Sequence, residues 1–322
     1  MAMIRGLSFL LLMTLLVGWG NANSQGFPAK PVRLIVPTAP GTAVQDILGR
    51  LMAPEMSKIF GHPVIVENRA GAGGMLAYEF VAKQAPADGH TLVLVTVPTL
   101  AALPVTVKDL RFNPGQDLPP VTELVEARLA MASASKLPWK SFGEMVAYAK
   151  ENPGKMNFGS GGLSTRLLGE VFLRDMALEM LQVSYSSGGP YFLALAAGDD
   201  IQLGFLAASS TGSIGNRLRV LSITGERRFG PLPNVPTFSE LGLQIPGQSF
   251  SMNVRGATPV GVINALYNVS LQVLQLPNVK STIEEKWQMD IVARKPEDAA
   301  KSLADQARLY AEIAKRAGIR PE

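Results

Sequence analysis

Residues 31–52 read PVRLIVPTAPGTAVQDILGRLM, and this stretch sets the fold class of the chain. Residues 32–36 form a short, β-branched run that predicts a buried strand. A loop of Gly, Pro and Thr follows as far as Gln45. From Asp46, which the pattern assigns as the N-cap, apolar residues recur at helical spacing. A strand that passes through such a loop into a helix is typical of a βαβ unit.

The same alternation continues along the chain. Strands are expected at residues 64–66, 91–96, 157–160, 181–185, 201–206 and 219–224. Helices are expected at residues 75–84, 142–152, 164–180, 191–198, 260–274, 279–288 and 296–317. This order predicts an α/β protein with mostly parallel sheets. Because the chain is too long for one ordinary core, two lobes are expected. Residues 25–125 plus 250–322 would form lobe one and residues 126–249 lobe two, with extended crossings near 125 and 250.

Residues 1–24 have the layout of a secretory signal peptide. Arg5 precedes an apolar run over residues 7–19, and Ala22 and Ser24 occupy the −3 and −1 positions of a cleavage site. A membrane anchor is the alternative, but a span needs roughly 20 apolar residues and this run is shorter. No Cys follows, which excludes a lipoprotein anchor. We expect cleavage after Ser24 and a periplasmic mature protein.

Composition excludes several classes of protein. The 30 Lys and Arg exceed the 26 Asp and Glu only slightly, and no basic cluster is interleaved with aromatic residues. Nucleic-acid binding is therefore disfavoured. The chain has no Cys, which excludes disulfides and thiolate metal sites. Its two His, His62 and His90, stand in turns without partners at metal spacing. We expect no metal and no cofactor.

Three loops, at residues 37–46, 159–164 and 184–190, share one design: each follows a strand and leads into a helix. In open α/β sheets, such loops lie at the carboxyl ends of the strands, where ligands bind. The free N–H groups of a first helical turn suit a carboxylate. The alternative is that the glycines only make tight turns. Loops in both expected lobes favour a ligand cleft between them.

Catalytic motifs are absent from the sequence. There is no G-x-S-x-G elbow around Ser160, and neither His is placed to activate a serine. Residues 71–74 resemble half a dinucleotide fingerprint, but Leu76 takes the position of the third glycine. Arg166 suits either a second ligand carboxylate or a solvated helix face, and Tyr185 suits either core packing or ligand stacking. An enzyme is not expected.

Several motifs resemble the tripartite tricarboxylate transporter receptors, also called Bug (Bordetella uptake gene) proteins. They are PVRLIVP at residues 31–37, Pro40-Gly41 with Asp46 and Arg50, VIVENRAGAGG at 64–74, DGHTL at 88–92, NPGKMNF at 152–158 and PNVPT at 233–237. The resemblance covers essentially the whole mature chain. It implies a two-lobed, type II-like periplasmic binding protein that closes over a small organic acid. It also implies transfer of that acid to two membrane proteins of a transporter, with a monomer as the expected state.

The resemblance also implies the ligand-binding residues. They are Ala39, Pro40, Gly41, Thr42, Ala43 and Val44 in lobe one, Gly159, Ser160, Gly161, Gly162 and Ser164 in lobe two, and Thr96, Thr99, Tyr185, Ser186, Ser187 and Gly188 around the remainder. Asp46 and Arg166, which stand beside the first two loops in the sequence, complete the set of candidates. In the family, the first two loops grip one carboxylate through backbone amides, small hydroxyls and water.

This chain departs from the family pattern in its loops. The first loop, PGTAVQD at residues 40–46, is one residue longer and poorer in glycine than the usual one. Gly161-Gly162-Leu163 replaces Asn-Gly-Thr, Arg166 replaces a frequent His, Ser186-Ser187 replaces Lys-Gly, and Leu206 replaces an Asp or Asn. These changes remove polar groups, so the hypothesis is a ligand more apolar than citrate or aspartate. Two other functions remain open: a sensory receptor with the same site, and an exported hydrolase using Ser160 or Ser164.

Overall fold

The computed structural model describes residues 26–41, 43–185, 188–225, 227–317 and 321. The expected signal peptide, residues 1–24, lies outside this part, as do Thr42, Ser186 and Ser187 of the expected site. Within the described ranges, no helix has the length and apolar character to cross a membrane.

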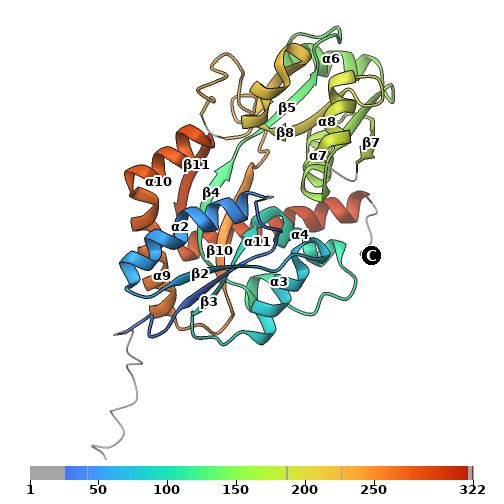
Figure 1. The fold of residues 1–322 in the computed structure, drawn as a ribbon. Helices are drawn as coiled ribbons and strands as arrows, with labels where there is room; N and C mark the ends of the chain where they lie inside the picture. Colours follow the sequence, from blue (N-terminus) through green and yellow to red (C-terminus); the bar gives the residue numbers. More distant parts are fainter. Residues whose placement is uncertain (1–25, 42, 186–187, 226, 318–320, 322) are drawn as a thin grey trace, which may run out of the picture.

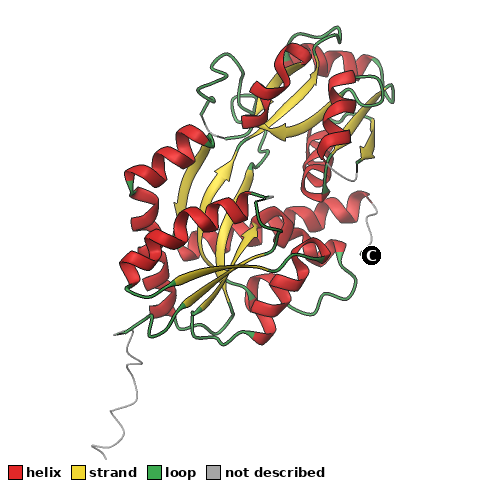
Figure 2. Cartoon of the chain, viewed as in Figure 1, coloured by secondary structure: helices red, strands yellow, loops and turns green. Residues whose placement is uncertain are grey.

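The strands form two sheets, as expected for the α/β class (Figures 1 and 2). The six-stranded sheet has the order β11-β4-β10-β3-β1-β2 and the five-stranded sheet the order β7-β6-β8-β5-β9. The strand bounds are β1 Val32–Val36, β2 Val64–Asn68, β3 Thr91–Thr96, β4 Pro120–Ala127, β5 Leu129–Ala134, β6 Met156–Ser160, β7 Met180–Ser184, β8 Leu203–Ala207, β9 Leu218–Ile223, β10 Gln248–Val254 and β11 Met289–Arg294.

Each sheet is mixed rather than mostly parallel. The expected parallel βαβ cores are present, as β2-β1-β3 in one sheet and β7-β6-β8 in the other. The remaining strands, β4, β10 and β11 in the first sheet and β5 and β9 in the second, add antiparallel pairs. The crossings between the sheets explain the antiparallel pairs. A strand that enters from the other sheet is not joined to its neighbour by a crossover helix, so it need not run parallel to it.

Helices cover both faces of the six-stranded sheet (Figure 2). The helical elements are α2 Val44–Phe60, η1 Ala72–Gly74, α3 Met75–Glu79, η2 Phe80–Gln84, α4 Val97–Thr106, α5 Pro114–Asp117, α6 Phe142–Glu151, α7 Leu163–Met176, α8 Gly188–Ala197, η3 Ala208–Arg217, α9 Val260–Gln275, α10 Pro277–Ser281, η4 Thr282–Lys286 and α11 Pro296–Ala317. Buried residues of α2, α9 and α10 pack on one face, and those of α3, α4 and α11 pack on the other.

Some expected boundaries were wrong. Helix α7 ends at Met176, because Ala177 adopts the left-handed conformation with φ 52° and starts the turn into β7. Helix α8 begins at Gly188, inside the expected loop. Helix α4, η3 and β11 were not expected at all. Helix α4 is apolar on nearly every side and contains Pro98 and Pro104, so it carries no amphipathic pattern.

The chain crosses between the sheets at two points. Only Arg128 separates β4 from β5, whereas residues 224–247 separate β9 from β10. The expected lobe boundaries, after residues 125 and 249, would cut β4 and β10, and the division into lobes at these residues stays a prediction. We call each sheet with the helices packed on it the six-stranded unit and the five-stranded unit.

Helix α11 contacts both units. It packs mainly on α4 and β4 of the six-stranded unit, and also on α7 of the five-stranded unit. Helix α7 in turn contacts α4. One hydrophobic cluster therefore continues from Ile35 in the first sheet to Phe158 in the second. Figure 1 shows α11 running beneath α7.

Candidate functional site

The loop after β1 is organised by Asp46. Its side chain is 1% exposed. Its carboxylate accepts hydrogen bonds from the Gly41 amide at 2.7 Å, Arg50 Nε at 2.9 Å and Asn68 Nδ2 at 2.7 Å. Asn68 Nδ2 also donates to the Thr38 carbonyl at 2.9 Å. Asp46 therefore fixes the loop from inside, with Gly41 turning at φ 71°.

The expected position of Asp46 in its helix changes, and its ionisation follows from its partners. The N-cap of α2 is Ala43, and Asp46 is the third helical residue, so the expected N-cap assignment was wrong. The hydrogen bond from Arg50, followed by those from Asn68 and Gly41, lowers the pKa of Asp46 to about 2 against the opposing effect of burial. An ionised carboxylate that accepts these three hydrogen bonds holds the loop in place.

A cavity of about 360 Å³ lies beside this loop. Three of the predicted residues line it: Ala39, Thr96 and Thr99. The other lining residues were not named as candidates, although Pro37, Thr38 and Gln45 belong to the first expected loop; the rest are Gly71, Gly73, Gly74 and Tyr78. The glycines were a missed signal, because Gly71, Gly73 and Gly74 all have positive φ and let the backbone approach closely.

The cavity offers neutral polar groups, and none of its lining residues is charged. Gln45 Nε2 donates to Thr96 Oγ1 at 2.5 Å. Thr38 Oγ1 is buried and has no hydrogen-bond partner among the described residues. Burial raises the pKa of Tyr78. Its hydroxyl is also hydrogen-bonded to the backbone of Thr96, which opposes that shift. Such groups can donate or accept hydrogen bonds but carry no charge.

Among the described residues, the helices that follow the first two loops begin without a side-chain cap, as do α3, α4, α9 and α10. Ala43, the N-cap of α2, and Gly162, the N-cap of α7, make no capping hydrogen bond. Their first-turn amides therefore carry partial positive charge without a side chain to accept from them. Val44, a predicted residue, is the first residue of α2. Ends of this kind suit an anion.

The second loop is shaped by close packing. A Cβ at Gly159 would lie 2.2 Å from Ile201 Cδ1, and one at Gly161 would lie 3.1 Å from the Tyr191 ring. Ser160 is fully buried, and its Oγ lies 3.2 Å from Ser184 Oγ. Gly159, Ser160 and Gly161 therefore support the loop from within.

The remaining candidates of the five-stranded unit lie nearer the surface. Ser164 is half-buried near the start of α7, whereas Gly162 and Arg166 are exposed. Tyr185 is half-buried, and its ring centroid lies 6.0 Å from that of Tyr191. Pro40 and Gly41 of the first loop are also exposed. None of these residues lines the 360 Å³ cavity, so this conformation does not bring the candidates of both units to it.

Other chemistry finds little support in the described ranges. They hold no group of three or more His, Asp or Glu that would bind a metal ion. His90 Nε2 accepts from the Ala29 amide at 3.2 Å, and its Nδ1 lies 3.3 Å from Asp88. His90 directly precedes β3, whereas the cavity lies at the other end of that strand.

Residues 48–319 match the family of tripartite tricarboxylate transporter receptors. The chain belongs to this family. It is 30% identical over 302 residues to a UPF0065 protein in the gbd 5′ region of Cupriavidus necator, covering 93% of this chain and 91% of the relative. As a member of the family, it is a substrate-binding receptor, which confirms the resemblance drawn from the motifs.

Solved structures agree with this assignment. The chain is similar to Rpa4515 of Rhodopseudomonas palustris with adipate, at 25% identity and TM-score 0.73, covering 92% of this chain and 100% of that one. It is also similar to MatC of Rhodopseudomonas palustris with bound malate, at 25% identity and TM-score 0.70, covering 89% and 99%. Both proteins are described with a small dicarboxylate.

Proposed function

We propose that this receptor is a periplasmic protein that captures a small organic carboxylate in the cavity beside the first turn of α2. The observation that carries the proposal is the position of this cavity, between Thr38, Gln45 and Thr99, next to a helix end without a side-chain cap. The adipate and malate found with two similar structures support a carboxylate as the ligand class.

The proposed binding relies on neutral donors. One ligand carboxylate accepts hydrogen bonds from the amides at the start of α2 and from Thr38 Oγ1. Hinge closure about the two crossings then brings the α7 end, with Gly162 and Ser164, onto the same carboxylate. Because the lining of the cavity carries no cation, the rest of the ligand is less polar than citrate.

The remaining parts of the proposal concern maturation and delivery. The signal peptide is cleaved after Ser24, and the mature monomer passes its ligand to the membrane proteins of a tripartite transporter. The receptor is not an enzyme. In support, the hydroxyl of Ser160 is buried against Ser184, and Ser164 is half-buried near the start of α7, about 70 or more residues along the chain from either His.

A thermal-shift screen of residues 25–322 tests the ligand class. The panel comprises dicarboxylates, tricarboxylates, amino acids and aromatic acids. Since binding to the native state stabilises it by mass action, we expect one class to raise the melting temperature by about 5 °C at 100 times its Kd. Citrate as the strongest ligand would contradict the low polarity proposed for the ligand. No shift in melting temperature with any carboxylate would contradict the ligand class.

Thr38→Val is expected to weaken carboxylate binding about tenfold while leaving the melting temperature of the free protein unchanged. The hydroxyl has no protein partner in the described structure, so only a ligand loses a hydrogen bond. Thr106→Val is the matched control, because Thr106 Oγ1 donates to Ala102 within α4 and lies outside the cavity. Equal affinity of the two variants, measured by calorimetry, would remove Thr38 from the site.

A further inference from the structure

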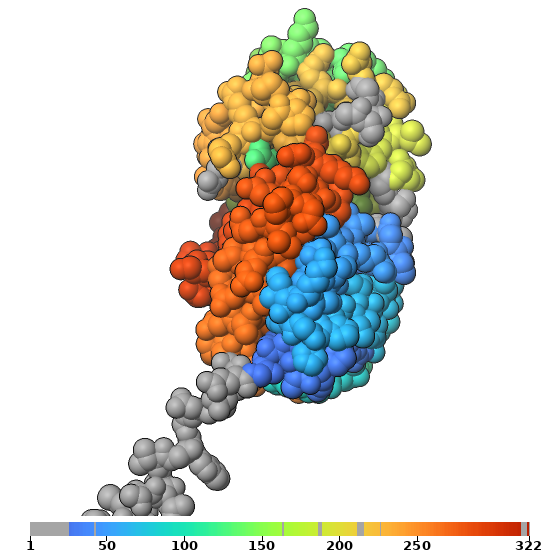
Figure 3. All heavy atoms as spheres, turned by 60° about the vertical axis from the view of Figure 1, so that its left-hand side comes forward, coloured from blue at the N-terminus to red at the C-terminus, as the bar shows by residue number. Residues whose placement is uncertain are grey.

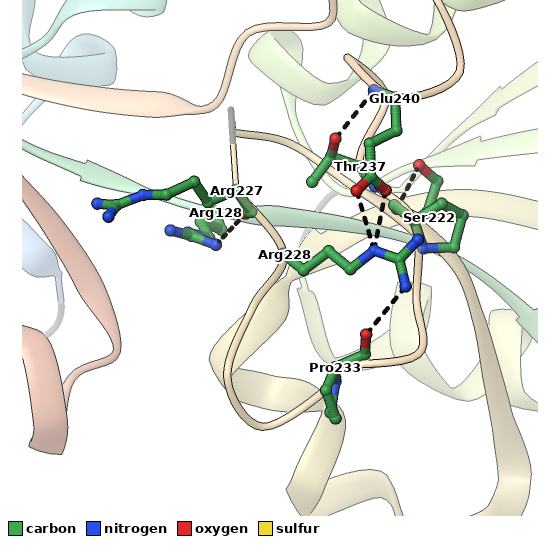
Figure 4. A network of polar contacts seen from close by, with 8 residues as sticks. Arg128, Ser222, Arg227, Arg228, Pro233, Thr237 and Glu240 are labelled. Carbon is green, nitrogen blue, oxygen red and sulfur yellow. Dashed lines mark hydrogen bonds and ion pairs between the residues drawn. The ribbon is translucent and has the colours of Figure 1, made fainter.

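Arg128 is the single residue between β4 and β5, and its side chain joins the two units. Its Nε and Nη2 donate to the Asp290 carboxylate on β11 at 2.5 and 2.7 Å. Its Nη1 donates to the Arg227 carbonyl at 2.6 Å, a contact drawn in Figure 4. One guanidinium therefore binds an edge strand of the six-stranded sheet and the second crossing at once. We call these three groups the Arg128 bridge.

The surroundings of Arg128 hold the guanidinium in place. Its side chain is only 10% exposed, and its guanidinium carbon lies 5.7 Å from the centroid of the Phe229 ring. Gly225, at φ 105°, leaves room beside the guanidinium. A Cβ added at this position would lie 3.6 Å from Arg128 Nε. The Arg128 carbonyl accepts from the Ala208 amide at 2.8 Å. The backbone of Arg128 is thus fixed to the five-stranded unit.

The two units are loosely packed around the bridge. A cavity of about 420 Å³ separates the segment at Phe229–Pro231 from the segment at Glu284–Asp290, and Arg128 lines it. Figure 3 faces this edge, where the orange region around α10 lies below the golden loop that follows β9. Strand β11 is at the opposite edge of the sheet from β2. The bridge is therefore remote from the proposed ligand cavity.

We propose that Arg128 is a positioning residue that holds the two units in the arrangement described here and so sets the equilibrium of lobe closure. Closing the lobes rotates the five-stranded unit about the residue that carries the bridge. The bidentate contact with Asp290 opposes that rotation, because a planar guanidinium keeps two hydrogen bonds only in one orientation. Weakening the bridge releases closure without touching the ligand.

Distances between spin labels in the ligand-free protein test this role. The chain has no Cys, so Ala147→Cys on α6 and Gln272→Cys on α9, both exposed, give one label on each unit. We expect Arg128→Gln and Asp290→Asn each to shift or broaden the distance distribution, and Arg128→Lys to do so less. Asp290 is 39% exposed, so its substitution serves as the variant least disruptive to folding.

Arg228→Gln is the matched control. Arg228 is on the same segment and pairs with Glu240 and the Pro233 carbonyl, all between β9 and β10 (Figure 4). It should leave the distance distribution unchanged. Identical distributions for Arg128→Gln, Asp290→Asn and Arg228→Gln would overturn the proposal.

A second measurement rests on the proposed function. If the bridge opposes closure, Arg128→Gln should lower the Kd of the best carboxylate by about three- to tenfold. The change should lie mainly in a slower dissociation rate. An unchanged Kd together with unchanged distances overturns the role of the bridge. A protein that binds no carboxylate but shows the distance shift contradicts the proposed function and still supports the bridge.

Discussion

Replacing Arg294 with alanine is expected to lower the free energy of unfolding by about 2–3 kcal/mol. The side chain of Glu123, on β4, is 1% exposed, and its Oε1 lies 2.6 Å from Arg294 Nη1. Among the described residues, neither carboxylate oxygen of Glu123 has a hydrogen-bond donor of good geometry. Without the Arg294 guanidinium, the buried Glu123 carboxylate loses its ion-pair partner. The cost stays below that of a fully buried pair, because Arg294 is 37% exposed and water can follow it.

Denaturant unfolding measures this loss, and Arg308→Ala is its matched control. Arg308 pairs with Asp305 on the exposed side of α11, where removal of one partner should change stability little. Adding Glu123→Gln to Arg294→Ala should recover at least half of the loss, since the unpaired charge is then gone. Equal stability of the Arg294→Ala and Arg308→Ala proteins would show that Glu123 does not depend on its partner.

Asp46→Asn is expected to lower the free energy of unfolding by about 2 kcal/mol at neutral pH and to weaken carboxylate binding. The pKa of Asp46 is lowered from an ordinary value of 3.8 to about 2, chiefly by the hydrogen bond from Arg50. A lowered pKa contributes stability that is fully present above about pH 4 and is lost as the pH falls toward 2. The difference between wild type and variant should therefore shrink over this range.

Asp305→Asn serves as the control for Asp46→Asn. Hydrogen bonds from Lys301 and Arg308 also lower the pKa of Asp305, but that carboxylate is on an exposed helix face away from the cavity. Its substitution should leave carboxylate affinity unchanged. A difference between wild type and Asp46→Asn that is as large at pH 2.5 as at pH 7 would show that the charge of Asp46 is not its source.

Local patterns were sufficient for the elements that pack in the ordinary way. The strands β1 and β3 have the predicted bounds, because each is a largely apolar, β-branched run that is buried at nearly every position. The amphipathic helix α11 also has its predicted bounds. Helix α4 and strand β11 carried no such pattern, since α4 is buried nearly all round and β11 pairs with β4 about 165 residues earlier.

The site could be predicted only in part, because its residues meet through pairing of distant strands. Ala39, Thr96 and Thr99 were found through the loop design and the family resemblance. Tyr78 reaches the cavity only because β1 and β3 pair side by side and α3 packs beneath them. The role of Asp46 depends on Asn68, which the parallel pairing of β1 with β2 brings beside it. Neither the place of Tyr78 at the cavity nor the contact between Asp46 and Asn68 can be predicted from spacing in the sequence.

The two crossings also order the events of folding during synthesis. The five-stranded sheet uses residues 129–223 without interruption, so it can form as soon as that stretch is available. The six-stranded sheet cannot close until β10 reaches β4 more than 120 residues later, and α11 then covers it last. Such long-range pairing slows folding and leaves β3 and β4 as unpaired edges meanwhile. A chain shortened before α11 should therefore keep a folded five-stranded unit, whereas its six-stranded sheet would retain all its strands but expose the apolar surface that α11 covers and become prone to aggregation.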